Sequence, residues 1–260
     1  MKEKYYFPFG QELKTVEQKD RSPKQAFVLG VYASAVHAMW KDKQGNLKVR
    51  ALAVASEPEI FWTGDNAKQL ISEIQIPEEL GSLTVLRGKN LNGPSGRTLD
   101  SKYLNPIGLT RENTWLCDIL PQSRLNDNQI KAIEKHYTPE IIERFCLTPV
   151  TIPKFKPADL NSEKRREEIL QELEQSKAER LILLGDLPIK WFLNYFDKNY
   201  TGLSDFGEIK QAYGQEHEIK INGHFYKVLP LCHPRQAGRL GRSNAKWGEL
   251  HDDWINRRIL

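Results

Sequence analysis

Short apolar runs that stop abruptly at glycine or at a polar residue constrain the fold of this chain most. Three of them are Ala26 to Gly30, Thr114 to Leu120 and Arg180 to Gly185, and a fourth leads to Leu231. Segments in which apolar residues recur at helical spacing separate these runs. Buried strands that alternate with helices are typical of a parallel sheet covered on both faces. The sequence therefore predicts an α/β fold.

Two turns predict hairpins beside the parallel strands. Lys43 to Asn46 separates the extended stretches Ser34 to Trp40 and Leu47 to Ala55. Asn222-Gly223 is the second turn, and both turns contain residues that tolerate positive φ. We expect a central four-stranded, mostly parallel sheet flanked by helices, with an added β-hairpin.

The rest of the chain divides into helices and one long loop. Ser82 to Asn113 is rich in glycine and proline, and we expect it to be irregular. Apolar spacing and capping residues predict the helices. They are expected over residues 66–74, 126–136, 138–146, 161–177, 188–195 and 243–258.

Length and charge set wide limits on function. A chain of 260 residues can bury a large core, and we expect residues 1–260 to form a single domain. The formal net charge of +4 does not by itself indicate nucleic-acid binding. The segment after Pro234 is locally basic, which suits either a polyanion or an ordinary solvated surface.

The cysteines and the lengths of the apolar runs limit further which class of protein the chain can belong to. The chain has three cysteines and no Cys-x-x-Cys pair, so a zinc or redox role is not expected. No signal peptide and no run long enough to cross a bilayer is visible. We expect a cytoplasmic monomer that does not bind membranes and needs neither a metal ion nor a cofactor.

Four short motifs end the expected strands in order along the chain. They are Gly30 to Ser34, Trp115 to Asp118, Leu183 to Asp186 and His233 to Gln236. In this order they resemble the motifs of the uracil-DNA glycosylase superfamily, and Ala51 to Ala55 resembles an extended segment that follows the first motif in several branches. The resemblance spans roughly residues 27–254. It implies a mostly parallel four-stranded sheet and cleavage of a base from DNA.

Three positions depart from the family's pattern. Tyr32 stands where the best-known branches carry the Asp or Asn that orients water, and Val54 replaces an aromatic residue that stacks on uracil. Asp118 stands in place of a base-reading Asn. An ionised Asp only accepts hydrogen bonds, whereas Asn also donates. We therefore expect a modified or non-uracil base.

The resemblance assigns roles to two histidines. His233 would donate to the base as it becomes anionic, and the alternative is a loop histidine bonded to the backbone. His37 would activate water or contact the flipped nucleotide, or else it packs under the hairpin. Tyr32 and Asp118 would shape the pocket, or instead cover the sheet edge and cap a turn. The expected substrate-binding residues are Gly30, Val31, Ala33, Ser34, Val54, Pro234 and Arg235.

The loop after His233 could hold nucleic acid. Arg239 and Arg242 would contact phosphates, and Leu240 would act as a wedge in the base stack unless it packs on the last helix. Asp186 is expected to be a turn residue and His251 a packing histidine. The expected function is a divergent DNA glycosylase. The alternatives are a non-catalytic nucleic-acid-binding module on the same fold and a nucleoside or nucleotide hydrolase.

Overall fold

The computed structural model describes residues 4–85, 91–240 and 245–259, and the chain packs into two compact units. The first unit comprises Met1–Val16, Ala33–Pro94 and Gln122–Lys156. The second comprises Glu17–Tyr32, Ser95–Pro121 and Pro157–Leu260. The chain therefore passes from one unit to the other several times, and a single domain over residues 1–260 stays a prediction.

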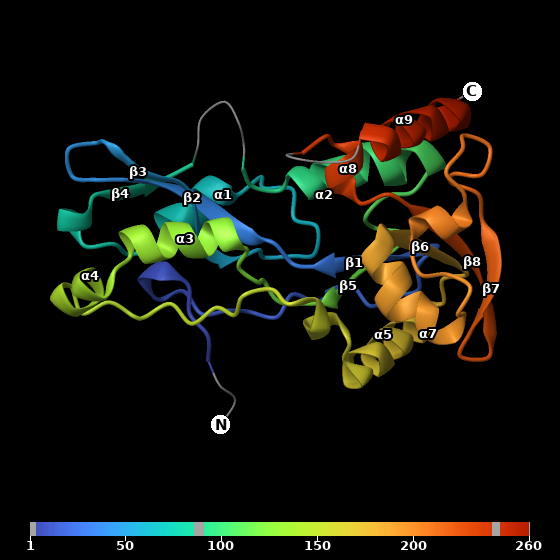
Figure 1. Ribbon diagram of the computed structural model, residues 1–260, viewed down its shortest axis with the longest axis horizontal. Coiled ribbons are helices and arrows are strands. Elements are labelled where there is room, and N and C mark those ends of the chain that lie inside the picture. Colours follow the sequence, from blue (N-terminus) through green and yellow to red (C-terminus); the bar gives the residue numbers. More distant parts are fainter. Residues whose placement is uncertain (1–3, 86–90, 241–244, 260) are drawn as a thin grey trace. The chain divides into compact units, whose positions relative to one another are not determined.

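The second unit contains a five-stranded sheet in the order β5-β1-β6-β8-β7 (Figure 1). The strands β5, β1, β6 and β8 are parallel, and β7 pairs antiparallel with β8 at the edge. Their bounds are β1 Ala26–Tyr32, β5 Thr114–Leu120, β6 Arg180–Leu184, β7 His217–Ile221 and β8 His224–Leu231. The expected four parallel strands are confirmed.

Helices cover both faces of this sheet because its central strands are apolar throughout. Phe27, Val28 and Leu29 of β1 are fully buried. Figure 1 shows α5 (Glu163–Ser176) on one side of the sheet and α9 (Ala245–Ile259) on the other. A buried strand cannot alternate polar and apolar residues, so its run is continuous. The expected α/β class is confirmed.

Short helical segments follow the strands of the second unit. Those at Asp186–Pro188 and Pro234–Ala237 begin shortly after β6 and β8 end, and the others lie in the longer connections that parallel pairing requires. Their bounds are η3 Asp100–Leu104, η4 Asn105–Ile107, η5 Pro157–Leu160, α6 Asp186–Pro188, η6 Ile189–Leu193, α7 Asn194–Phe196, η7 Leu203–Phe206 and α8 Pro234–Ala237.

The β7-β8 hairpin confirms the second expected turn. Asn222 and Gly223 form it with φ values of 47° and 90°. Positive φ at both central residues gives the turn a twist that matches that of the strands. The residues on either side, Ile221 and His224, are paired in the ladder.

The first unit contains an antiparallel sheet in the order β3-β2-β4. The hairpin of β2 (Ala35–Lys41) and β3 (Leu47–Ser56) confirms the first expected turn. The third strand, β4, was not expected. The remaining elements of this unit are η1 Pro8–Gly10, α1 Ala67–Ser72, η2 Glu78–Leu80, β4 Ser82–Thr84, α3 Asp127–His136 and α4 Pro139–Arg144.

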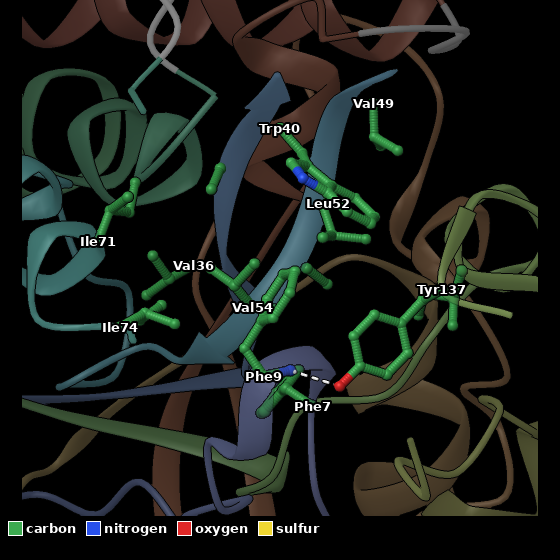
Figure 2. Close-up of a cluster of buried hydrophobic side chains, with 14 of the residues drawn as sticks. Phe7, Phe9, Val36, Trp40, Val49, Leu52, Val54, Ile71, Ile74 and Tyr137 are labelled. Carbon is green, nitrogen blue, oxygen red and sulfur yellow. Dashed lines mark hydrogen bonds between the residues drawn. The ribbon is translucent and has the colours of Figure 1, made fainter. Parts of the chain in front are cut away.

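A hydrophobic cluster fills the space beside this smaller sheet (Figure 2). Trp40 and Leu52 contribute to it from β2 and β3, and both are buried. The backbone N–H of Phe9 donates to the Tyr137 hydroxyl at 3.1 Å, so the amino-terminal segment is tied to residues that follow α3 (Figure 2). The first unit thus has a core of its own.

The expectation of an irregular loop over residues 82–113 is wrong in part. That stretch contains β4, α2 (Pro94–Leu99), η3 and η4. Pro94 begins a helix, a position at which proline costs nothing because its missing N–H would have no partner there. Leu99, Tyr103 and Leu104 are buried, so tertiary packing stabilises helical turns that local propensity does not predict.

Candidate active site

The carboxyl ends of the four parallel strands carry the candidate site, and all of them belong to the second unit. Gly30 of β1 is in register with Asp118 of β5. Gly185 follows β6 and donates its N–H to the Leu231 carbonyl at 2.7 Å, two residues before His233. Ligands of open α/β sheets bind at this edge. The motif after β6 and the motif after β8, which are distant in sequence, therefore lie at the same edge of the sheet.

The candidate polar side chains, Asp118 and His233, lie on either side of β1 and β6 in the strand order. Asp118 is on β5 and His233 follows β8, and the order β5-β1-β6-β8 separates these strands by three spacings. At ~4.8 Å per spacing the separation is about 14 Å, so the two side chains do not bond each other. Gly30, two residues before the end of β1, and Gly185, directly after β6, have no side chains.

His233 is held in one tautomer by the backbone. It caps α8, and the N–H of Arg235 donates to its Nδ1 at 3.1 Å. Burial, assisted by the charge of Arg235, lowers the pKa of His233 to about 4, so the ring is neutral at pH 7. In a neutral ring whose Nδ1 accepts, Nε2 carries the proton. The backbone bond foreseen in the alternative interpretation is therefore present, and it leaves Nε2–H as a donor.

Asp118 has an unusual protonation equilibrium. The residue is only 3% exposed, and burial raises the pKa of its carboxyl to about 7, against an opposing effect of the Arg165 charge. Near neutral pH a large fraction of the carboxyl is protonated, and that form donates one hydrogen bond and accepts others. Asp118 is therefore not fully ionised near neutral pH, contrary to the expectation from the sequence, because it is buried.

Gly185 is required by its backbone and by its neighbour. Its φ is +88°, in the region that L side chains rarely adopt. A Cβ at this position would lie 3.1 Å from the Cβ of His233. Asp186, the next residue, accepts from the N–H of Leu203 at 2.8 Å, as expected of a turn residue. The turn after β6 therefore packs against His233.

The other residues expected at this edge differ in exposure. Tyr32, the last residue of β1, is half-buried, and burial raises the pKa of its hydroxyl, opposed by the charge of Arg235. Val31 and Pro234 are buried. Arg235 is exposed and donates from Nε to the Leu240 carbonyl at 3.1 Å. Tyr32 and Arg235 are thus the side chains of this group that reach the surface.

Four predicted site residues, Ala33, Ser34, His37 and Val54, belong to the first unit. Ala33 is buried and Ser34 is exposed. Val54 has no exposed surface and packs in the hydrophobic cluster (Figure 2), so its contacts are those of a core residue. The assignment of Val54 to substrate binding stays a prediction.

His37 is held by a polar group of the first unit. Its Nε2 lies 2.9 Å from Nε2 of Gln129. The Gln129 Oε1 accepts from the N–H of Asn126 at 2.8 Å, so the amide nitrogen is the donor and His37 accepts. The proton then resides on Nδ1, which is buried without a hydrogen-bond partner among the described residues. Burial lowers the pKa of His37 to about 4.

The loop expected to contact nucleic acid is described only as far as Leu240. Arg239 forms an ion pair with Asp252 at 3.0 Å, and its side chain remains 67% exposed. Leu240 is partly buried, and its N–H donates to the Arg235 carbonyl at 2.8 Å. Arg242 lies outside the described residues. A phosphate contact by Arg239 would have to compete with its ion pair.

Sequence reasoning did not single out Arg165. Its Nη2 donates to the Asp118 carbonyl at 2.8 Å, and its Nε donates to the Ile119 carbonyl at 3.2 Å. Its Nη1 forms an ion pair with Glu172 at 3.0 Å. The residue lies in a highly charged helix between Lys164 and Arg166, and no local signal distinguishes it from these neighbours.

Within residues 4–85, 91–240 and 245–259, no group of three or more His, Cys, Asp or Glu side chains could hold a metal ion. No helix in the same ranges has the length and apolar character needed to cross a bilayer.

The fold and the strand-end residues define an α/β protein with a candidate site at the carboxyl edge of its parallel sheet. The sequence matches no protein-family model and no curated protein.

Proposed function

We propose that this protein is a divergent DNA glycosylase that hydrolyses the N-glycosidic bond of a base in nucleic acid. The observation that carries the proposal is the neutral His233, whose Nδ1 accepts from the Arg235 N–H and whose Nε2–H is thereby left as a donor. Cleavage leaves negative charge on the departing base. A neutral hydrogen-bond donor held at a base oxygen stabilises that negative charge, and the donor carries no positive charge that the base would neutralise.

Asp118 would read the edge of the base on the far side of Gly30. In its protonated form the carboxyl can donate to a base carbonyl and accept from a ring N–H. In its ionised form it accepts only, from a ring N–H and an exocyclic amine. With a pKa of about 7, both forms are populated at neutral pH. The proposal therefore includes oxo bases as well as the amino-bearing or modified bases favoured by the sequence.

One observation favours the alternative of a non-catalytic nucleic-acid-binding module. Tyr32 stands at the expected water-activating position, and burial raises the pKa of its hydroxyl. A phenol that stays protonated at neutral pH is a poor general base. If no other group activates water, the edge would bind a base without releasing it.

Base release from defined oligonucleotides tests the proposal. The substrates are single- and double-stranded oligonucleotides that each carry one uracil, hypoxanthine or N-alkylated adenine. We expect the wild type to release at least one base and His233→Ala to be slower by on the order of 100-fold. His224→Ala, which changes an exposed histidine of β8, is the matched control.

The other outcomes distinguish the alternatives. Binding of the oligonucleotides without release of any base would contradict the proposal and support the binding module. Cleavage of free nucleosides but not of oligonucleotides would support a nucleoside hydrolase.

A further inference from the structure

The peptide groups on either side of Cys232 are held by two buried tyrosines. The Tyr103 hydroxyl donates to the Cys232 carbonyl at 2.7 Å. The Cys232 N–H donates to the Tyr213 hydroxyl at 2.9 Å. β8 ends at Leu231, so the two hydroxyls take over from the strand ladder at this point. Buried backbone groups need such partners, because an unpaired one costs the free energy of a lost hydrogen bond.

His251 determines the direction of the hydrogen bond between its own ring and the Tyr213 hydroxyl. Its Nε2 lies 2.9 Å from the Lys102 carbonyl, which can only accept, so Nε2 carries a proton. Burial lowers the pKa of His251 to about 4, opposed by the Lys102 carbonyl and the Asp252 charge and assisted by the Lys102 charge. In the neutral ring Nδ1 accepts, and the Tyr213 hydroxyl donates to it at 2.8 Å. The Cys232 N–H therefore donates to the Tyr213 hydroxyl oxygen, and the Tyr213 O–H donates in turn to Nδ1 of His251.

The residue after this anchored peptide is His233. Its N–H donates to Oε1 of Gln236 at 3.1 Å, and Gly185 approaches its Cβ from the neighbouring strand end. The orientation of the imidazole follows from where Cys232 places the chain, because the ring must reach the Arg235 N–H through Nδ1. A shift of the Cys232 peptide would weaken that bond and release the ring from one tautomer.

We infer that Tyr213, oriented by His251, and Tyr103 are positioning residues that set the direction of the His233 Nε2–H. A role of these tyrosines in catalysis rests on the proposed glycosylase function, whereas their effect on the orientation of the His233 imidazole does not. Neither tyrosine needs to touch a substrate, since both act through Cys232. The network explains why His251, which is expected from the sequence to be a packing residue, has both ring nitrogens bonded.

Nitrogen NMR of the histidine rings in the full-length protein tests the inference directly. In the wild type we expect His233 to show an unprotonated Nδ1 and a protonated Nε2. In Tyr213→Phe and Tyr103→Phe we expect signals averaged between the two tautomers and a pKa that moves up toward the ordinary value near 6.5. Tyr137→Phe is the matched control, because it removes a buried, doubly bonded hydroxyl in the first unit.

A kinetic arm uses an oligonucleotide whose base the wild type releases. Tyr213→Phe should lower kcat on the order of 10- to 100-fold with KM within about twofold, since a misplaced donor affects the transition state more than ground-state binding. If the wild type releases no base, the proposed function fails and the NMR arm still decides the inference.

Thermal unfolding establishes which variants are folded, and Tyr103→Phe carries the test if Tyr213→Phe does not fold. An unchanged His233 tautomer and titration in a folded Tyr213→Phe or Tyr103→Phe protein would overturn the inference. An equal change in Tyr137→Phe would overturn it too, because the effect would then be a general loss of packing.

Discussion

The guanidinium of Arg165 binds the backbone carbonyl of Asp118 at 2.8 Å, not its carboxyl group. Arg165 thereby holds the end of β5 in place from the α5 side while its charge partly offsets the desolvation of the Asp118 carboxyl. One side chain thus affects both the position and the ionisation of the group that we propose reads the base.

Replacing Arg165 with methionine should raise the pKa of Asp118 above its value of about 7, because a stabilising positive charge is lost. The fold should also lose about 2 kcal/mol, since two strand-end carbonyls and Glu172 lose their partner. Carboxyl NMR and urea unfolding measure the two effects. Arg165→Lys, which keeps the charge, should move the pKa less. Equal shifts in both variants would show that charge is not the cause.

Asp118 should make the protein less stable as pH rises. Its pKa is about 7 in the folded state against 3.8 as the reference value, so the folded state binds more protons between these limits. The stability contributed by this group is fully present below pH 3.8 and is lost as the pH rises through 7, by roughly 4 kcal/mol at most.

Asp118→Asn should remove this loss, so the variant should gain on the wild type in free energy of unfolding between pH 4 and pH 7. The difference between the two proteins is the quantity to measure, by urea unfolding at each pH. The comparison matters because His37, His233 and His251, whose pKa values are lowered, act in the opposite direction over the same range. A difference that does not vary with pH would contradict the assignment.

Gly185→Ala should disturb His233 as well as the backbone. Positive φ at alanine costs about 1 kcal/mol, and the added Cβ would press on the His233 Cβ. Gly223→Ala is the matched control, because Gly223 has φ +90° but open space around its Cβ position. Both variants should lose stability in thermal unfolding, and only Gly185→Ala should slow base release. Equal activity in the two variants would show that the contact with His233 is unimportant.

Arg239→Ala should weaken oligonucleotide binding to a similar degree for every sequence and reduce the salt slope by about one. The expectation follows from the exposure of the Arg239 guanidinium, which its ion pair with Asp252 leaves at 67%. Fluorescence anisotropy at several salt concentrations measures both quantities. Arg257→Ala, which breaks a comparable pair with Asp253, is the control. An unchanged slope would remove Arg239 from the nucleic-acid contact.

Both hairpins of this protein and every described strand except β4 could be predicted from local sequence. The run around Phe27 predicted a strand buried on both faces, and Asn222-Gly223 predicted the turn of the observed hairpin. Strand ends also placed His233 and Asp118 at one edge of the sheet. These features depend on periodicity and on turn residues, which act over a few neighbouring positions.

Local signals failed where distant segments supply the stabilisation. The short helices within residues 82–113 form because Leu99 and Tyr103 are buried, although glycine and proline predicted a loop. Val54 lies in an apolar run that does not show what its side chain contacts, and only the tertiary structure places it in the hydrophobic cluster of the first unit.

The sequence alone determined the α/β class, the two hairpins and the presence of His233 at a strand end. Tertiary structure decided the state of the site. The hydrogen bonds that hold Cys232 include one between residues more than 100 positions apart, from Tyr103 to Cys232. The protonation of Asp118 and His233 follows from burial. Desolvation and long-range hydrogen bonds exist only after packing, so no local pattern encodes them.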